Sequence, residues 1–342
     1  LAQFLEYLES GERDPEEIAF MEPQAGGACR AGNIYNLLQR VLYRMAEQGQ
    51  TEYAQIPVIS LNLMGEEKHT GFRITPGLLS GGIAAGCYGD LIMCLYQQVK
   101  PYEQNPGETD RIRSQVEKKL CESIRRHRNG RHTREKNYRY ACEVFSKVPV
   151  KPGKKKRVGI TGEIYMKYSK LGNDDIESFL LRQGMEPYSG GFINYCLYLV
   201  DTERYKAEKY QRNPIMAKAC AFVLHRLCEA QKHLLTVIGE TDRFQTDLPF
   251  PELKEKVQGI LAEGCNTGDG WLIAAEVIQY VEKGCGSVLI LHPFGCLVSH
   301  VCERGILQRL HARFPDVSIQ TIEYDYDQSK TLRESRILLA IS

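Results

Sequence analysis

The most informative segment for the fold lies late in the chain, at Ser287-Val-Leu-Ile-Leu-His-Pro-Phe-Gly-Cys296-Leu-Val-Ser-His300. It opens with an apolar run typical of a buried strand, passes a Pro/Gly break and a cysteine, and continues as a helical pattern to Phe314. A strand that ends in a glycine-containing loop delivers its cysteine to the carboxyl edge of a parallel sheet. The N-terminus of the following helix favours the thiolate. The sequence therefore predicts a strand–loop–cysteine–helix unit that presents Cys296.

A second unit of the same order lies near the start, in Ile18-Ala-Phe-Met-Glu-Pro-Gln-Ala-Gly-Gly-Ala-Cys29-Arg-Ala-Gly-Asn33. A helical pattern over residues 34–48 follows it. Two such units in one chain predict that Cys29 and Cys296 face a common site.

Length and composition set broad limits on the class of protein. The 342 residues are 43% hydrophobic and 25% charged, which is enough for two domains with a core each. The formal net charge of +1 argues against a nucleic-acid partner. Apolar runs shorter than the roughly 18 residues of a membrane span predict a soluble, cytoplasmic protein with no membrane partner. The chain starts at Leu1 inside a helical pattern, so we expect its first domain to be incomplete.

The twelve cysteines are scattered, and no CxxC pair occurs among them. This removes the zinc ribbon, the thioredoxin motif and the ferredoxin run. Any single one of these cysteines, taken alone, is more often a small buried core residue than a ligand.

Strand and helix patterns alternate along the chain, with the last two strands at 287–291 and 317–324. A long polar helix is expected over 111–147, and a Pro/Gly-rich basic linker follows at 148–157. The predicted fold class is α/β, with two Rossmann-like open parallel-sheet domains flanked by helices. The first domain spans 1–150 and is incomplete at its N-terminus; the second spans 151–342.

The residues around Cys296 invite a zinc interpretation. His292, His300 and Cys302 surround it in sequence. Their spacing nevertheless predicts that they do not converge as zinc ligands do.

A glycine-rich loop before a helix is the second local pattern that invites ligand chemistry. Gly268 and Gly270 free its backbone to approach an anion or cofactor, although a plain tight turn explains them equally well. Asp269 and Glu276 are possible acid or base groups, but the sequence gives neither of them a partner. The sequence therefore singles out no catalytic residue.

Several motifs in order resemble the C-terminal part of the large activase-related proteins of the 2-hydroxyacyl-CoA dehydratase superfamily. They are Pro23-Gln-Ala-Gly-Gly-Ala-Cys29-Arg-Ala-Gly-Asn33, Pro57-Val-Ile-Ser-Leu-Asn62, Tyr88-Gly-Asp-Leu-Ile-Met93, Pro101-Tyr-Glu103, Gly162-Glu-Ile-Tyr-Met-Lys-Tyr-Ser169, Leu171-Gly-Asn173, Gly268-Asp-Gly-Trp271 and Pro293-Phe-Gly-Cys-Leu297. The resemblance covers nearly the whole chain.

The resemblance implies a [4Fe-4S] cluster, or a double-cubane [8Fe-9S] cluster, between two Rossmann-like domains. Cys29 and Cys296 are the implied metal ligands, with Cys265 as a less favoured third, and Gly268 and Gly270 as cofactor-binding positions. The family places a Phe-Cys pair after the last unit's strand, whereas this chain has Phe294-Gly-Cys296. Remaining ligands are expected upstream, so a fragment without a cluster is also compatible with the resemblance.

The implied function is low-potential electron transfer in anaerobic metabolism, by a reductase or dehydratase-like component. An ATP-dependent activase module, in cis or in trans, is the implied partner, and a small molecule such as an acyl-CoA thioester is the implied substrate; a homodimer is compatible with this function. Two alternatives stay open. One is a non-catalytic scaffold or regulatory module that keeps the fold, and the other is a cluster-free enzyme that binds CoA or a nucleotide at residues 268–271.

Overall fold

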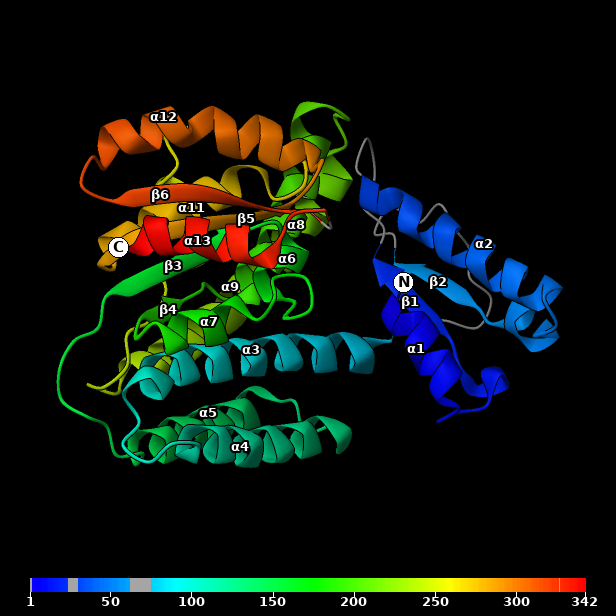
Figure 1. Ribbon diagram of the computed structural model, residues 1–342, viewed down its shortest axis with the longest axis horizontal. Coiled ribbons are helices and arrows are strands. Elements are labelled where there is room, and N and C mark those ends of the chain that lie inside the picture. Colours follow the sequence, from blue (N-terminus) through cyan, green and yellow to red (C-terminus); the bar gives the residue numbers. More distant parts are fainter. Residues whose placement is uncertain (1, 24–29, 62–74, 326) are drawn as a thin grey trace. The chain divides into compact units, whose positions relative to one another are not determined.

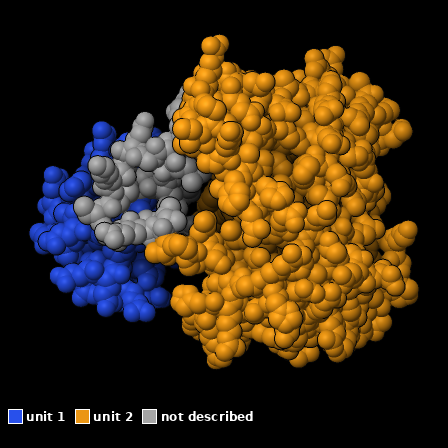
Figure 2. Space-filling view, turned by 180° about the vertical axis from the view of Figure 1, so that it is seen from behind, with its two compact units in different colours: residues 1–74 blue, residues 75–342 orange. Residues whose placement is uncertain are grey.

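The computed structural model describes residues 2–23, 30–61, 75–325 and 327–342 (Figure 1). The chain divides into two compact units, Leu1–Ile74 and Thr75–Ser342, which Figure 2 colours separately. Both contain parallel strands flanked by helices. The predicted α/β class is thus confirmed at the level of mixed α/β structure with parallel sheets.

The smaller unit is built around two parallel strands, β1 (Phe20–Pro23) and β2 (Val58–Leu61), with Phe20 opposite Val58. Its helices are α1 (Ala2–Ser10) and α2 (Ile34–Glu47), and short 3-10 turns occupy η1 (Pro15–Glu17), η2 (Arg30–Asn33) and η3 (Thr51–Gln55). Leu38 and Leu42 of α2 are buried in a core that both strands share. The helix predicted after Cys29 is therefore present, while Cys29 itself lies outside the described residues.

The larger unit holds a four-stranded sheet in the order β4-β3-β5-β6, with every neighbouring pair parallel. Its strands are β3 (Arg157–Gly162), β4 (Glu186–Tyr188), β5 (Cys285–Pro293) and β6 (Ser318–Tyr324). Residues 287–292 of the central strand β5 are all buried, as its apolar run predicts. Both strands expected at the end of the chain are confirmed.

Helices cover both faces of this sheet (Figure 1). Val288 and Ile290 of β5 face a core shared with α11 and α12, whereas Leu289 and Leu291 face α6, α7 and α13. The helical elements of the unit are α3 (Pro76–Val99), η4 (Lys100–Tyr102), α4 (Glu108–Arg125), α5 (Arg131–Ser146), α6 (Ile164–Tyr168), α7 (Ile176–Arg182), α8 (Phe192–Lys209), α9 (Pro214–Gly239), α10 (Phe250–Glu255), α11 (Gly270–Glu282), the π-helical turn η5 (Ser299–Glu303), α12 (Arg304–Arg313) and α13 (Lys330–Ile341).

The helix expected over 111–147 is instead a pair of helices, α4 and α5. The chain turns between them at His127, whose φ of 55° is left-handed. Each helix has an apolar face, and Val116 of α4 and Phe145 of α5 are both fully buried in one core. Because the chain turns back, the apolar face of each short helix can pack in the core shared with α3, whereas a single straight helix would carry one of these faces away from it.

The sequence predicts that residues 148–157 form a linker between two domains. In the structure, however, a single hydrophobic core contains residues from both sides of this stretch: from α3, α4 and α5 before it and from α8, α9 and α11 after it. Val148 inside the stretch is itself buried. The boundary between compact units therefore lies between Ile74 and Thr75 rather than at residue 150.

The length and composition of residues 76–102, which include α3, would suit a membrane span. In this unit, however, Leu91 and Leu95 of α3 are fully buried in the shared core. Burial against other helices explains the apolar character of this half of α3.

Candidate functional site at the carboxyl edge of the sheet

The strand order of the larger unit reverses between β3 and β5, because β4 follows β3 on one side and β5 follows on the other. Ligands of open α/β sheets bind outside the carboxyl ends of the strands at such a point. Gly162 ends β3 there with a φ of 128°, and a Cβ on it would lie 2.0 Å from the Leu291 carbonyl oxygen. The next residue, Glu163, donates its backbone N–H to that oxygen at 2.8 Å. Glycine thus lets the two strand ends approach closely.

The loop after β5 presents Cys296, as predicted. The backbone N–H of Cys296 donates to the Pro293 carbonyl at 3.2 Å, and Gly295 supplies a left-handed φ of 71°. Burial raises the pKa of the Cys296 thiol, and hydrogen bonds from Ser299 only partly oppose this. The prediction that the helix N-terminus favours the thiolate is therefore wrong for the free protein, because desolvation of the charged form outweighs the local N–H groups.

Cys265 and Cys302 lie in the neighbourhood of Cys296. Burial raises the pKa of Cys302 to about 11, and the negative charges of Cys265, Glu303 and Cys296 act in the same direction. The loop with Cys265 packs on the turn after Cys296, since a Cβ on Gly268 would lie 2.5 Å from Val298 Cγ2. Two loop cysteines, Cys265 and Cys296, therefore lie within electrostatic reach of Cys302 in the π-helical turn η5.

Gly268 and Gly270 serve this packing directly. Both have positive φ, 57° and 33°, and a Cβ on Gly270 would lie 2.2 Å from the Cys265 carbonyl oxygen. That carbonyl accepts the backbone N–H of Trp271 at 2.9 Å. The two glycines shape the loop that carries Cys265, and their predicted contact with a cofactor stays a prediction.

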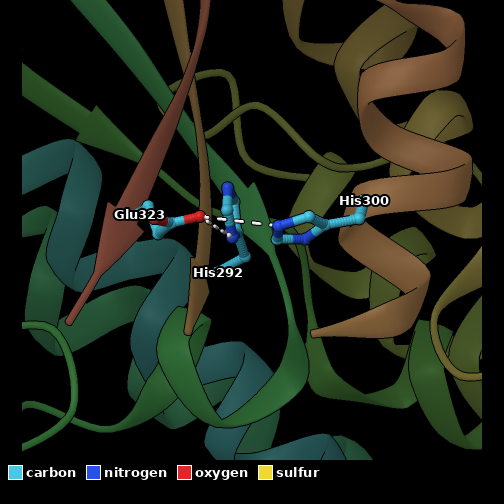
Figure 3. A group of neighbouring side chains, drawn as sticks. All are labelled: His292, His300 and Glu323. Carbon is cyan, nitrogen blue, oxygen red and sulfur yellow. Dashed lines mark ion pairs between the residues drawn. The ribbon is translucent and has the colours of Figure 1, made fainter. Parts of the chain in front are cut away.

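His292, His300 and Glu323 meet beside the same loop (Figure 3). One donor atom from each lies within 4.8 Å of the other two. The rings of His292 and His300 are 5.6 Å apart and nearly perpendicular. The prediction that these histidines do not converge is therefore wrong. His300 Nδ1 lies 2.9 Å from the Cys296 carbonyl oxygen, which turns the ring back toward the end of β5.

Buried carboxyl groups line this edge as well. Burial raises the pKa of Asp269 well above its usual range, and the charges of Glu163 and Glu303 act in the same direction. Burial also raises the pKa of Glu303 to about 8, although Ser299 Oγ donates to its Oε1 at 2.7 Å. At neutral pH Glu303 is therefore largely protonated, and a carboxylic acid can donate a hydrogen bond that a carboxylate cannot.

A buried ion pair next to this edge gives Glu276 the partner that the sequence does not indicate. Lys167 Nζ lies 2.7 Å from Glu276 Oε1, and Thr161 Oγ1 donates to Oε2 at 2.5 Å. The only signal in the sequence is that Lys167 belongs to the Gly162–Ser169 motif. Such a motif says nothing about a partner 109 residues away.

Lys167 also reaches a cavity of about 230 Å³ on the side of α3. Arg113 and Lys170 line it together with the carboxylates Glu117 and Glu177. Arg113 pairs with Glu117 at 2.7 Å, so the charges of the wall are matched. Lys170 pairs with Asp175 at 3.3 Å and Lys167 with Glu276, so the described cations of the wall are all paired and none is free for an anion.

The thiols fit an iron–sulfur group in donor chemistry, since thiolates are the usual ligands of such clusters. Cys296 and Cys265 come singly from loop ends, and Cys302 lies within electrostatic reach of both. Cys29 lies outside the described residues, so its pairing with Cys296 stays a prediction. Comparisons with protein-family models, with curated proteins and with solved structures found no match to this chain.

Proposed function

We propose that this chain is an iron–sulfur protein of the 2-hydroxyacyl-CoA dehydratase type, with Cys296 as a cluster ligand. The observation that carries the proposal is that Cys302 lies within electrostatic reach of both Cys265 and Cys296, in the segments that follow and flank the carboxyl end of β5. The sequence resemblance adds the second support. The strand order β4-β3-β5-β6 also supports the finer assignment of a Rossmann-like domain.

The chain's own residues would hold and tune the group. Cys296, Cys265 or Cys302, and Cys29 supply thiolates, whose formation on metal binding releases protons. Val298 and Trp271 are nearly or fully buried and would give the group an apolar wall on one side. Protonated Glu303 can donate a hydrogen bond toward sulfur, and such bonds help to set the reduction potential. When bound, the cluster supplies single electrons at low potential.

Partners follow from the same proposal. An ATP-dependent activase, in cis or in trans, would deliver the electron, and a small molecule such as an acyl-CoA thioester would accept it. The described cysteines are all free thiols, which favours a reducing compartment such as the cytoplasm.

Anaerobic reconstitution of the full chain with ferrous iron and sulfide tests the proposal. Iron and acid-labile sulfide per chain, and the EPR signal after reduction, are measured for wild type, Cys296→Ala and Cys121→Ala. Cys121 is an exposed free thiol on α4 and serves as the matched control. We expect Cys296→Ala to lose most of the iron and the EPR signal, and Cys121→Ala to keep both.

Three further variants then show which other cysteines bind the cluster and which only lie near it: Cys29→Ala, Cys265→Ala and Cys302→Ala. Unchanged iron in Cys296→Ala would refute the assignment of this ligand. A wild-type chain that takes up no iron and sulfide would leave the non-catalytic scaffold as the better description.

A further inference from the structure

We propose that His292, His300 and Glu323 form a mononuclear site for a divalent metal of the zinc or ferrous class, distinct from the thiol site. His292 lies at the end of β5, Glu323 lies at the end of β6, and His300 lies in the π-helical turn between these strands. Glu323 projects from β6 toward both rings (Figure 3). This inference does not depend on the iron–sulfur proposal.

The distances are close to those of a bound metal. Glu323 Oε2 lies 3.9 Å from His292 Nδ1 and 3.8 Å from His300 Nε2. A tetrahedral metal with bonds of about 2.0–2.2 Å places its ligand atoms roughly 3.4 Å apart. Closing the site therefore requires the two carboxylate–imidazole pairs to approach by about half an ångström, which side-chain torsions can supply, while the two imidazole nitrogens start within 4.8 Å of each other.

His300 is oriented as a metal ligand usually is. Its Nδ1 lies 2.9 Å from the Cys296 carbonyl oxygen, and a carbonyl can only accept, so Nδ1 carries the proton. In the neutral ring, Nε2 then directs a lone pair toward a carboxylate oxygen that also has only lone pairs. Such a meeting is unfavourable unless a proton or a metal cation lies between them. Ligating histidines commonly donate their other N–H to a backbone carbonyl in this way.

His292 offers the second nitrogen ligand. Its side chain is 0% exposed, and its Nδ1 faces Glu323 Oε2 at 3.9 Å. The same Nδ1 is 3.4 Å from the Pro293 carbonyl oxygen, which is long for a hydrogen bond. A metal on Nδ1 would leave Nε2 as the N–H of the ring. The case for His292 as a ligand therefore rests on the position of Nδ1 opposite the Glu323 carboxylate.

The donor set selects the metal class. Two imidazole nitrogens and one carboxylate oxygen suit zinc or ferrous iron, whereas magnesium and calcium prefer oxygen ligands alone. Three protein ligands leave at least one coordination position open for water or substrate. No thiol belongs to this group, although the Cys296 carbonyl orients His300.

Arg304 is the competitor of the metal. Its Nη2 lies 3.0 Å from Glu323 Oε2, the same oxygen that faces both rings. The guanidinium is 47% exposed, so it can move into solvent when a metal arrives. Removing this cation should strengthen metal binding, because Glu323 then has no other positive partner among its described ion pairs outside the two histidines.

Cobalt(II) is the probe for the test, added to the chelator-treated full chain without iron or sulfide and followed by its visible absorption. We expect one cobalt per chain, weak d–d bands without thiolate-to-metal charge transfer, and displacement by zinc. Glu323→Gln and His300→Ala should weaken binding by more than the roughly 10–100-fold that loss of an outer-shell partner costs. Arg304→Gln should strengthen it several-fold. His225→Ala, on the exposed side of α9, should leave it unchanged.

Cys296→Ala separates this site from the thiol site, because it keeps the backbone carbonyl that orients His300. Cobalt binding should persist in Cys296→Ala even where iron–sulfide uptake is lost. Thermal melts in the presence of chelator identify any variant that fails to fold. Equal cobalt affinity in wild type, Glu323→Gln and His300→Ala would overturn the proposal. So would charge-transfer bands that disappear in Cys296→Ala, since the thiols would then hold the metal.

Discussion

Lys167 and Glu276 form an ion pair in the interior of the larger unit, with both side chains only 3% exposed. The ammonium contacts both carboxylate oxygens, at 2.7 and 2.9 Å. The pair joins α6 to α11 beside the carboxyl end of β3. Removing one partner of a buried pair leaves an uncompensated charge, which costs far more than removing both.

Lys167→Met is therefore expected to lower the free energy of unfolding by about 3–5 kcal/mol. The double variant Lys167→Met/Glu276→Leu should recover a large part of that loss, because no buried charge remains. Urea unfolding followed by circular dichroism measures both. The exposed pair of Lys147 and Glu143 is the matched control, where the same changes should cost less than about 1 kcal/mol. A double variant as unstable as Lys167→Met would contradict this account.

Gly162→Ala should be strongly destabilising, because its Cβ would lie 2.0 Å from the Leu291 carbonyl oxygen on the neighbouring strand. Substitution of Gly153 is the control that measures backbone strain without such a clash. It has a similar φ of 122°, but a Cβ placed on it would meet no atom within 4 Å. We expect Gly153→Ala to cost about 1–3 kcal/mol for strain alone. Gly162→Ala should cost clearly more in the same thermal or urea experiment, and equal losses would show that the strand ends can separate.

The buried carboxyl of Asp90 is expected to make the free energy of unfolding depend on pH. Its carboxyl accepts the backbone N–H groups of Phe192 and Ile193, at 2.7 and 2.9 Å, at the start of α8. Burial nevertheless raises the pKa of Asp90 to about 7. Between about pH 4 and 7 the folded chain then holds a proton that the unfolded chain has released, so this group's contribution to stability falls as pH rises.

The measurement is the difference in unfolding free energy between wild type and Asp90→Asn across this range. Relative to Asp90→Asn, wild type should lose roughly 2–4 kcal/mol from about pH 4 to 7 and little more above that range. Asp242→Asn, at an exposed position, is the control and should give a flat difference. A flat difference for Asp90→Asn as well would show that the carboxyl is ionised throughout.

Thiol labelling should divide the cysteines by burial. Burial raises the pKa of Cys285 to about 12 and of Cys142 to about 11, and both lie in the core. Cys121 is exposed. Alkylation in native buffer, located by mass spectrometry, should therefore modify Cys121 first, while Cys285 and Cys142 react only after urea is added. Native labelling of Cys285 at the rate of Cys121 would contradict the position of β5 in the sheet.

The local strand, loop and helix units could be predicted from short-range sequence patterns. A short uninterrupted apolar run indicates a buried strand, and the Pro/Gly break after it indicates where the strand ends. The strand β5 and the loop that presents Cys296 therefore follow from residues 287–296. Periodicity also indicates the apolar face of α2. These features depend on neighbours within a few positions, which is the range over which a pattern carries information.

Contacts between residues far apart in the sequence became visible only in the folded unit. The meeting of Lys167 with Glu276 needs α6 and α11 on adjacent strand ends, and the meeting of His300 with Glu323 needs β5 beside β6. The turn at His127 and the division at Thr75 likewise depend on how apolar faces pair across the whole unit. The physical reason is that each side chain is buried by residues from other elements. Its partners, its pKa and the free energy of burying it therefore depend on which elements the strand order places beside it.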